Sequence, residues 1–174
     1  MVREAALTEL AERGYGGFSI ESVSRRCGVA KSTIYRHWPG RLALVAEAFE
    51  SLDVQPPGGG GTAEGAPARV EELLRHLAQA MRDSRFGGCL PALIEASEHD
   101  PDVARFLHGF SARRRQALVD AIEHGVSAGD LRPGLPAEET ALTLSGAIIY
   151  CRLMTDQAFD PEDVLRLMAT ILPG

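Results

Sequence analysis

The sequence predicts an all-α fold of about nine helices arranged in two parts. Every periodic apolar segment of the 174 residues has helical spacing, and none alternates as a half-buried strand would. The stretch QPPGGGGTAEGAP, residues 55–67, is rich in Gly and Pro and interrupts this periodicity. Residues 1–50 carry seven Lys or Arg against six Asp or Glu, whereas residues 51–174 carry eleven against eighteen. This asymmetry indicates two parts with different roles.

Short breaks divide each part into helices. In the first part the breaks are Gly14, Gly28 and the pair Pro39-Gly40, and Ser19 is a suitable N-cap. The four helices expected there cover about residues 2–13, 20–27, 31–38 and 41–52. The five expected later cover about residues 68–83, 89–98, 102–128, 137–157 and 161–172. We therefore place a first domain at residues 1–52, a flexible connector at 53–67 and a second helical domain at 68–174.

Residues 22–46 contain no Asp or Glu, although the whole chain has a formal net charge of -6. The helix expected at residues 31–38 has one narrow apolar edge, Ile34 and Trp38, and its other sides are polar. It follows a second short helix and a Gly turn, which is typical of a helix-turn-helix whose second helix enters the major groove of DNA. The cations of this segment are Arg25, Arg26, Lys31, Arg36 and Arg41.

The polar side chains of this segment suit contacts with DNA. Long cations reach phosphates or guanine edges, hydroxyls are short enough to touch bases or backbone, and Tyr and His donate hydrogen bonds to phosphate oxygens. Arg41 adds its charge to the free N–H groups at the start of the next helix. A solvated helix whose charges have no role is the weaker alternative. The predicted DNA-binding residues are Lys31, Ser32, Thr33, Tyr35, Arg36, His37 and Arg41.

The stretch FSIESVSRRCGVAKSTIYRHWPGRLALVAEAF resembles the DNA-binding region of the TetR family of bacterial transcriptional regulators. ERGYGGFSI is similar to the family's join between its first two helices. The resemblance covers residues 1 to about 50 and implies a ligand-responsive helix-turn-helix regulator. Arg41 falls where the family usually has a phosphate-binding Lys, and Trp38 replaces the commoner Phe. The first helix begins almost at Met1, so we expect either weaker affinity without a basic N-terminal arm or a native start upstream.

In the second domain the resemblance implies a dimer interface formed by the last two helices. The helix over residues 137–157 is apolar around much of its circumference, so it must be covered on several sides. Gly146 and Ala147 would let another helix approach closely. The alternative is that both helices only complete the core of one subunit. The residues predicted for dimerisation are Leu144, Ile148, Cys151, Val164, Met168 and Ile171.

The resemblance also implies a ligand pocket between the connector and the dimer helices. Met and aromatic side chains suit adaptable binding of a mostly apolar small molecule. Each of them is also explained by ordinary core packing. The predicted lining residues are Met81, Phe86, Leu93, Phe106, Phe110, Tyr150 and Met154.

No catalytic motif, metal-ligand spacing or membrane-spanning run is found in the sequence. The three cysteines are odd in number and far apart, which is typical of reduced thiols in a cytoplasmic protein. We therefore expect no enzyme, no cofactor, no metal and no membrane partner. The predicted function is a homodimeric repressor that binds a pseudo-palindromic operator in double-stranded DNA and is released by a small ligand. The alternative is a helical small-molecule-binding or protein-interaction dimer that has lost DNA binding.

Overall fold

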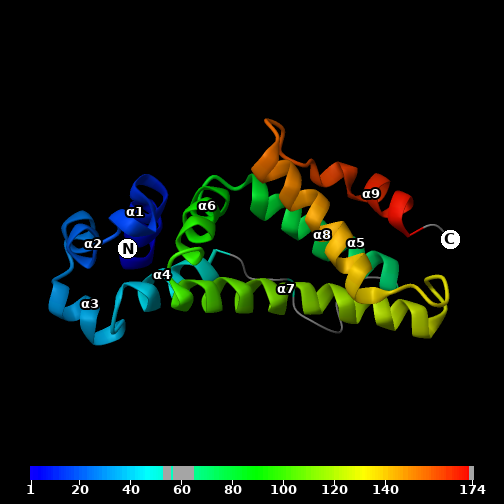
Figure 1. Cartoon of the computed structure of the whole chain (residues 1–174), viewed down its shortest axis with the longest axis horizontal. Coiled ribbons are helices and arrows are strands. Elements are labelled where there is room, and N and C mark those ends of the chain that lie inside the picture. The colour runs from blue at the N-terminus through cyan, green and yellow to red at the C-terminus, as the bar shows by residue number, and fades with distance from the viewer. Residues whose placement is uncertain (53–55, 57–64, 173–174) are drawn as a thin grey trace. The chain divides into compact units, whose positions relative to one another are not determined.

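The computed structural model describes residues 1–52, 56 and 65–172 of the chain, and within them it is entirely helical (Figure 1). Nine α-helices and one short 3₁₀ turn are formed by these residues, which confirms the predicted all-α fold. Most of the predicted connector lies outside the described residues. No helix in the described part of the chain is long and apolar enough to cross a membrane.

The chain folds into two compact units. The first unit combines Met1–Val54 with Asp83–Phe110, and the second combines Gln55–Arg82 with Ser111–Gly174. The long helix α7 (Pro101–Ala128) therefore belongs to the first unit at its start and to the second unit beyond Phe110. The first unit is larger than the first domain drawn from the sequence, because α6 (Phe86–Ser97) and the start of α7 pack with the N-terminal helices.

The N-terminal helices of the first unit begin and end at the predicted breaks, with one difference. They are α1 (Val2–Gly17), α2 (Ile20–Cys27), α3 (Lys31–His37) and α4 (Arg41–Glu50). The regular helix is broken at Gly14 as predicted, at φ 66° and ψ 174°, but after this kink helical backbone resumes and α1 extends to Gly17. Glycine adopts this left-handed region without steric cost. The kink carries Tyr15 into the core, where it is 3% exposed.

The helix-turn-helix of α2 and α3 is built from local signals that the sequence contains. Ser19 caps α2 by accepting a hydrogen bond from the Ser22 backbone N–H at 3.2 Å. Gly28 ends α2 in the left-handed conformation, at φ 72°. The Ser24 hydroxyl donates to the Val29 carbonyl at 2.6 Å and holds the turn. These contacts fix the direction in which α3 leaves α2.

An aromatic cluster centred on Phe49 of α4 forms much of the core of the first unit. Its ring stacks on Phe86 of α6 at a centroid distance of 4.6 Å and tilts against Phe110 of α7 at 5.1 Å. Phe106 meets the same ring edge-on at 6.4 Å. Such aromatic pairs stabilise a core beyond the apolar area that they bury. The last helix of the N-terminal segment is therefore packed directly on α6 and α7.

The second unit consists of α5 (Ala66–Arg82), the rest of α7, α8 (Ala137–Met154), the 3₁₀ turn Pro161–Asp163 and α9 (Val164–Ile171). Helix α5 packs against both α8 and α9. The start of α5 is tied to the loop after α7, because the Ala66 backbone N–H donates to Asp130 Oδ2 at 3.2 Å. The predicted bounds of these helices agree with the structure to within a few residues.

The tightest approach in the second unit is at Gly125 of α7. A Cβ atom at this position would lie 2.7 Å from Ala66 Cβ and 2.8 Å from Leu131 Cδ1. We expect Gly125→Ala to destabilise the protein by about 1–3 kcal/mol, because the start of α5 has to move away. Chemical denaturation would measure this loss. Gly88→Ala is the matched control, because its Cβ would lie 3.8 Å from Ala11, an ordinary contact. Equal stability of both variants would contradict the predicted close packing.

Candidate nucleic-acid interface

Helix α3 is seated on the first unit through one edge, as its apolar pattern predicts. Ile34 is fully buried, with an exposed fraction of 0%. Trp38, just beyond the helix, is half-buried, and its indole N–H donates to Glu47 Oε2 of α4 at 2.7 Å. The larger ring thus supplies both an apolar contact and a hydrogen bond between α3 and α4. The remaining sides of α3 are left for another molecule.

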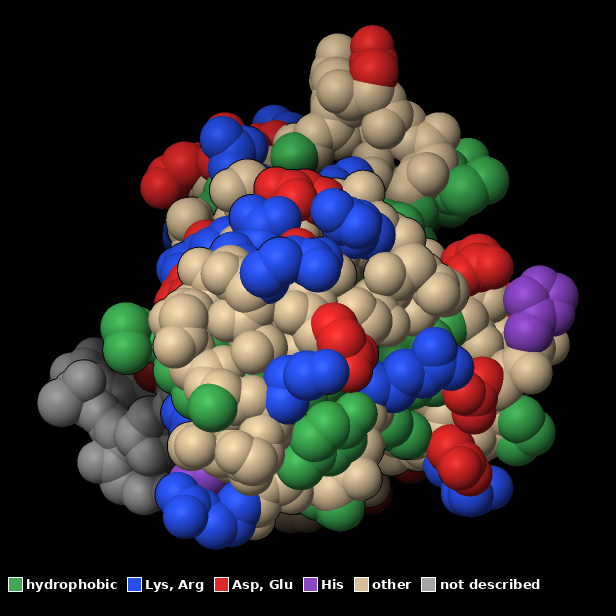
Figure 2. All heavy atoms as spheres, turned by 90° about the vertical axis from the view of Figure 1, so that its left-hand side faces the viewer, with side chains coloured by type: hydrophobic (Ala, Val, Ile, Leu, Met, Phe, Trp, Pro, Cys, Tyr) green, Lys and Arg blue, Asp and Glu red, His purple; other side chains and the backbone are tan. Residues whose placement is uncertain are grey.

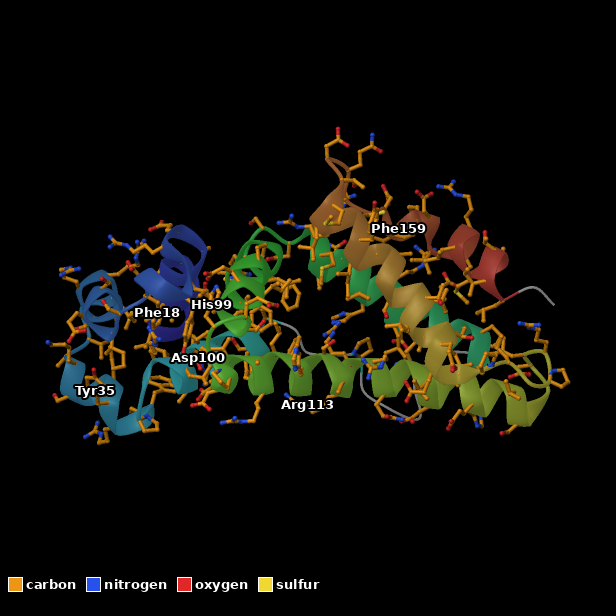
Figure 3. The ribbon with its side chains drawn as sticks, in the orientation of Figure 1. Phe18, Tyr35, His99, Asp100, Arg113 and Phe159 are labelled. Atoms are coloured by element: carbon orange, nitrogen blue, oxygen red, sulfur yellow. The ribbon has the colours of Figure 1, made fainter. Side chains whose placement is uncertain are left out.

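The predicted DNA-binding side chains lie on the free sides of α3 and at the start of α4. Thr33 is half-exposed and the other six are exposed. Tyr35, labelled in Figure 3, is 48% exposed, so its ring and hydroxyl are accessible from outside. Figure 2 faces this end of the chain, where Lys and Arg side chains lie on the surface with Asp and Glu among them. The structure therefore brings the predicted set together on accessible surface.

The cations of the segment without carboxylates have different environments. Arg26 joins α2 to α1, because its Nε donates to Glu9 Oε1 at 3.0 Å and its Nη2 pairs with Glu12. Glu9 is 2% exposed and also pairs with Arg13 at 3.1 Å. The hydrogen bonds to Glu12 and Glu9 raise the pKa of Arg26. This side chain holds the helix-turn-helix on α1 and is already engaged within the protein.

Two of the predicted DNA contacts also have carboxylate neighbours. Lys31 Nζ donates to Glu21 Oε1 at 3.1 Å, and this hydrogen bond lowers the pKa of Glu21. Arg41 lies with its guanidinium carbon 4.4 Å from the centroid of the Tyr15 ring, and its Nη2 is 3.8 Å from Asp100 Oδ2. Arg36, by contrast, makes no ion pair with any described residue. It is the cation of α3 most available to an incoming anion.

Sequence reasoning missed Tyr15 and Asp100 as neighbours of Arg41. Burial raises the pKa of Tyr15, while the nearby charge of Arg41 lowers it to a smaller extent. A Tyr after a glycine and an Asp before a proline are the only signals that the sequence offers for them. Neither signal says that the two residues meet at the same cation, because that contact depends on tertiary packing.

The predicted pocket residues do not form one group in either unit. Phe86, Phe106 and Phe110 pack around Phe49 in the first unit, so they have the core role that the sequence left open as an alternative. Leu93 is fully buried in the same unit. The other three predicted residues, which belong to the second unit, are the buried Met81 and the exposed Tyr150 and Met154, at 60% and 69%.

The residues predicted for dimerisation lie mainly on the inner side of α8 and α9. Leu144, Ile148 and Val164 are 0% exposed, and Met168 is 7% exposed. They fill the core of the second unit, so they offer almost no surface to a second subunit. Cys151 and Ile171 are half-buried. The large apolar side chains that remain exposed on these two helices are Leu142, Tyr150, Met154 and Leu165.

A partly buried cation in α7 was also missed. Arg114 lies on the same side of the helix as the buried Leu107 and Leu118, and desolvation lowers its pKa to about 10. Its neighbours differ from it: Arg113 is exposed (Figure 3), and Arg115 pairs with Glu138 at 3.5 Å. Three consecutive arginines therefore have three separate environments, as expected from the 100° turn between successive residues of a helix.

Comparison with protein families gives two matches that together cover most of the chain. Residues 2–48 match the family described as bacterial regulatory proteins, tetR family, and residues 67–171 match the tetracyclin repressor-like C-terminal domain. The chain belongs to the TetR family. This membership confirms the resemblance drawn from the sequence and makes the protein a DNA-binding helix-turn-helix transcriptional regulator.

Individual TetR-family relatives and neighbours agree with this assignment. The HTH-type transcriptional regulator YdeS of Bacillus subtilis is 27% identical over 177 residues, covering 99% of this chain and 87% of YdeS. A TetR-family regulator from Rhodococcus sp. superposes with a TM-score of 0.77 at 19% identity, covering 98% of this chain and 96% of its own. FadR of Bacillus subtilis, solved with stearoyl-CoA, also gives 0.77, at 15% identity and 99% and 97% coverage. Both YdeS and the Rhodococcus protein are named as transcriptional regulators.

Proposed function

We propose that the protein is a homodimeric cytoplasmic repressor that binds a pseudo-palindromic operator and is released from it by a small, mostly apolar ligand. The observation that carries the proposal is the surface of α3. Ile34 anchors the helix, while its cations, hydroxyls and Tyr35 are accessible on the second helix of a helix-turn-helix. Residues 1–52 are the proposed DNA-binding domain, and residues 68–174 the proposed ligand-binding and dimerisation domain.

Different residues of this surface have different proposed roles. Tyr35, His37 and Arg41 bind phosphates, which position the protein without reading sequence. Lys31, Ser32, Thr33 and Arg36 lie along the groove-facing helix and reach base edges or the adjoining backbone. The exposed Arg41 lies at the first turn of α4, where free N–H groups favour an anion.

A dimer is supported by the exposed apolar side chains of α8 and α9, here called the apolar face: Leu142, Tyr150, Met154 and Leu165. Large apolar groups exposed together on a soluble protein mark an interaction surface. Gly146 lies on α8 between Leu142 and Tyr150, and a Cβ there would meet nothing within 4 Å. A second helix can therefore approach closely at this point. In a two-fold dimer, the recognition helices would lie about 34–36 Å apart, one turn of B-DNA.

The proposed ligand is a small, mostly apolar molecule held in the second domain. The neighbour FadR, with the same fold, was solved with stearoyl-CoA, which combines a long apolar chain with a polar head. Of the lining residues predicted from sequence, Met81 is buried in the second unit and remains a proposed contact. Tyr150 and Met154 are assigned instead to the apolar face.

Salt-titrated binding to the DNA that flanks the protein's own gene tests the proposed function. Arg36 and Arg41 of two subunits would neutralise about four phosphates, so affinity should fall about 100-fold between 50 and 200 mM salt. A shuffled duplex of the same composition should bind at least about 1,000-fold more weakly. Equal, weak binding to both duplexes would contradict the regulator and favour a helical dimer that has lost DNA binding.

A further inference from the structure

The carboxylate of Asp100 joins two helices of the first unit. Asp100 lies immediately before α7, and its Oδ1 accepts from the backbone N–H groups of Asp102 at 3.0 Å and Val103 at 3.4 Å. Its Oδ2 is 3.8 Å from Nη2 of Arg41, the first residue of α4. One oxygen therefore caps α7 while the other faces a predicted DNA contact. Asp100 is labelled at this junction in Figure 3.

The guanidinium of Arg41 is held from a second side by α1. Its central carbon is 4.4 Å from the centroid of the Tyr15 ring, and Tyr15 itself is 3% exposed. A buried ring under a guanidinium favours the cation and fixes the plane in which its N–H groups lie. The Arg41 side chain is nevertheless 46% exposed. Tyr15 thus orients the cation without hiding it from an incoming anion.

On the basis of the proposed function, we propose that Asp100 competes with a DNA phosphate for Arg41 and thereby lowers the affinity of the regulator for DNA. Both anions are attracted to the same guanidinium, and they repel each other at short range. The long Oδ2–Nη2 distance and the partial exposure of Asp100 make the internal pair weak, so a phosphate displaces it at a modest cost.

The same carboxylate links this competition to the long helix. Asp100 is fixed to the first turn of α7 by two backbone hydrogen bonds, so it moves with that turn. Helix α7 continues without a break from the first unit, to which its start belongs, into residues of the second unit. A ligand that shifts α7 by about 1–2 Å along its axis changes the distance between Asp100 and Arg41. Asp100 is thus a positioning residue through which α7 regulates the phosphate contact.

Asp100→Asn tests the proposal, because Asn caps a helix as well as Asp but carries no charge. The probe is a 30-bp duplex of arbitrary sequence at 50 mM salt, since a phosphate contact is independent of sequence. We expect binding about 2- to 5-fold tighter per subunit, hence about 4- to 25-fold tighter for a dimer. The gain should vanish in an Arg41→Ala background, because the competition requires that cation.

Glu98→Gln is the matched control. Glu98 is an exposed carboxylate two residues away, it makes no ion pair with the described part of the chain, and its change alters the net charge equally. We expect less than a 2-fold effect, since exposed charges beyond contact distance are screened. Asp100→Ser, which also caps, replaces Asp100→Asn if the latter melts at a lower temperature than the parent.

The proposal would be overturned by no gain from Asp100→Asn, by an equal gain in the Arg41→Ala background, or by an equal gain from Glu98→Gln. Absence of any binding to the arbitrary duplex would overturn it as well, because Arg41 would then have no phosphate to bind. If the parent protein binds all duplexes equally, this result contradicts only the proposed repressor function. The comparison on the arbitrary duplex still decides the role of Asp100, so the two failures are distinguishable.

Discussion

Tyr150→Glu is expected to convert the proposed dimer into monomers at micromolar concentration. Tyr150 is 60% exposed in the apolar face, so the change leaves the subunit core intact but places two carboxylates in a two-fold interface. Losing two large buried side chains costs about 3–6 kcal/mol, which raises the dimer dissociation constant about 10²- to 10⁴-fold. Sedimentation equilibrium measures this constant directly. Operator affinity should fall in parallel, because each monomer then holds a single half-site.

Gly146→Leu provides an independent test of the same surface. A Cβ at this position meets nothing within 4 Å in the subunit, so a leucine is expected to project outward and block a neighbouring helix. Gln79→Glu on α5 is the control, since it adds the same charge as Tyr150→Glu at an exposed polar position. If the Tyr150 and Gly146 variants remain dimeric with parental operator affinity, the interface does not use the apolar face. Interfaces elsewhere on the chain would then have to be tested.

Helix positions were predictable from the sequence because their signals are local. Ser19 caps α2 and Gly28 ends it, and both effects operate within a few residues of the chain. Gly14 shows the limit of such reasoning. The sequence predicts the break at Gly14, but it does not show that helical backbone resumes after the break and places Tyr15 in the core. The outcome is set by packing that no local pattern contains.

The two faces of α8 could not be told apart from the sequence. Its two apolar stripes lie side by side, one containing Leu144 and Ile148 and the other Leu142 and Ile149. A helix that is apolar on both sides has to be covered on both, but periodicity does not say which side meets the helix's own subunit. Contacts with α5 and α9 bury the first stripe. The residues predicted for dimer contacts on α8 therefore came from the stripe that faces the core of its own subunit.

The DNA-binding segment was recognisable from its composition, but the state of each cation was not. The composition of the segment does not distinguish Arg26 from Arg36, because each contributes one positive charge. In the structure Arg26 pairs with Glu9 and Glu12 of α1, whereas Arg36 makes no ion pair with the described residues. The carboxylates that separate them are 14 to 17 residues away along the chain. Only the packing of α1 on α2 shows which cation is available to DNA.

Arg41→Ala and Lys31→Ala are expected to weaken DNA binding in two different ways. Arg41 is the proposed phosphate contact, so its loss should weaken binding to every sequence by about 100-fold for a dimer and reduce the salt slope by about two. Lys31 is the proposed base contact. Its loss should cost about 1–3 kcal/mol per half-site on the operator but much less on other sequences. Binding-site selection from a randomised duplex, run at two salt concentrations, measures both effects.

Arg41→Lys separates the phosphate contact from the packing of Arg41 on Tyr15. A lysine keeps the charge at the start of α4 but cannot stack its head group on the ring as a planar guanidinium does. Compared with Arg41→Ala, the Arg41→Lys variant should therefore recover most of the DNA affinity and of the salt slope. The thermal stability of the first unit need not recover. If Arg41→Lys binds no better than Arg41→Ala, the side chain acts through its contact with Tyr15. In that case the phosphate site lies elsewhere on the helix-turn-helix, and Arg36 on the exposed side of α3 is the first cation to test.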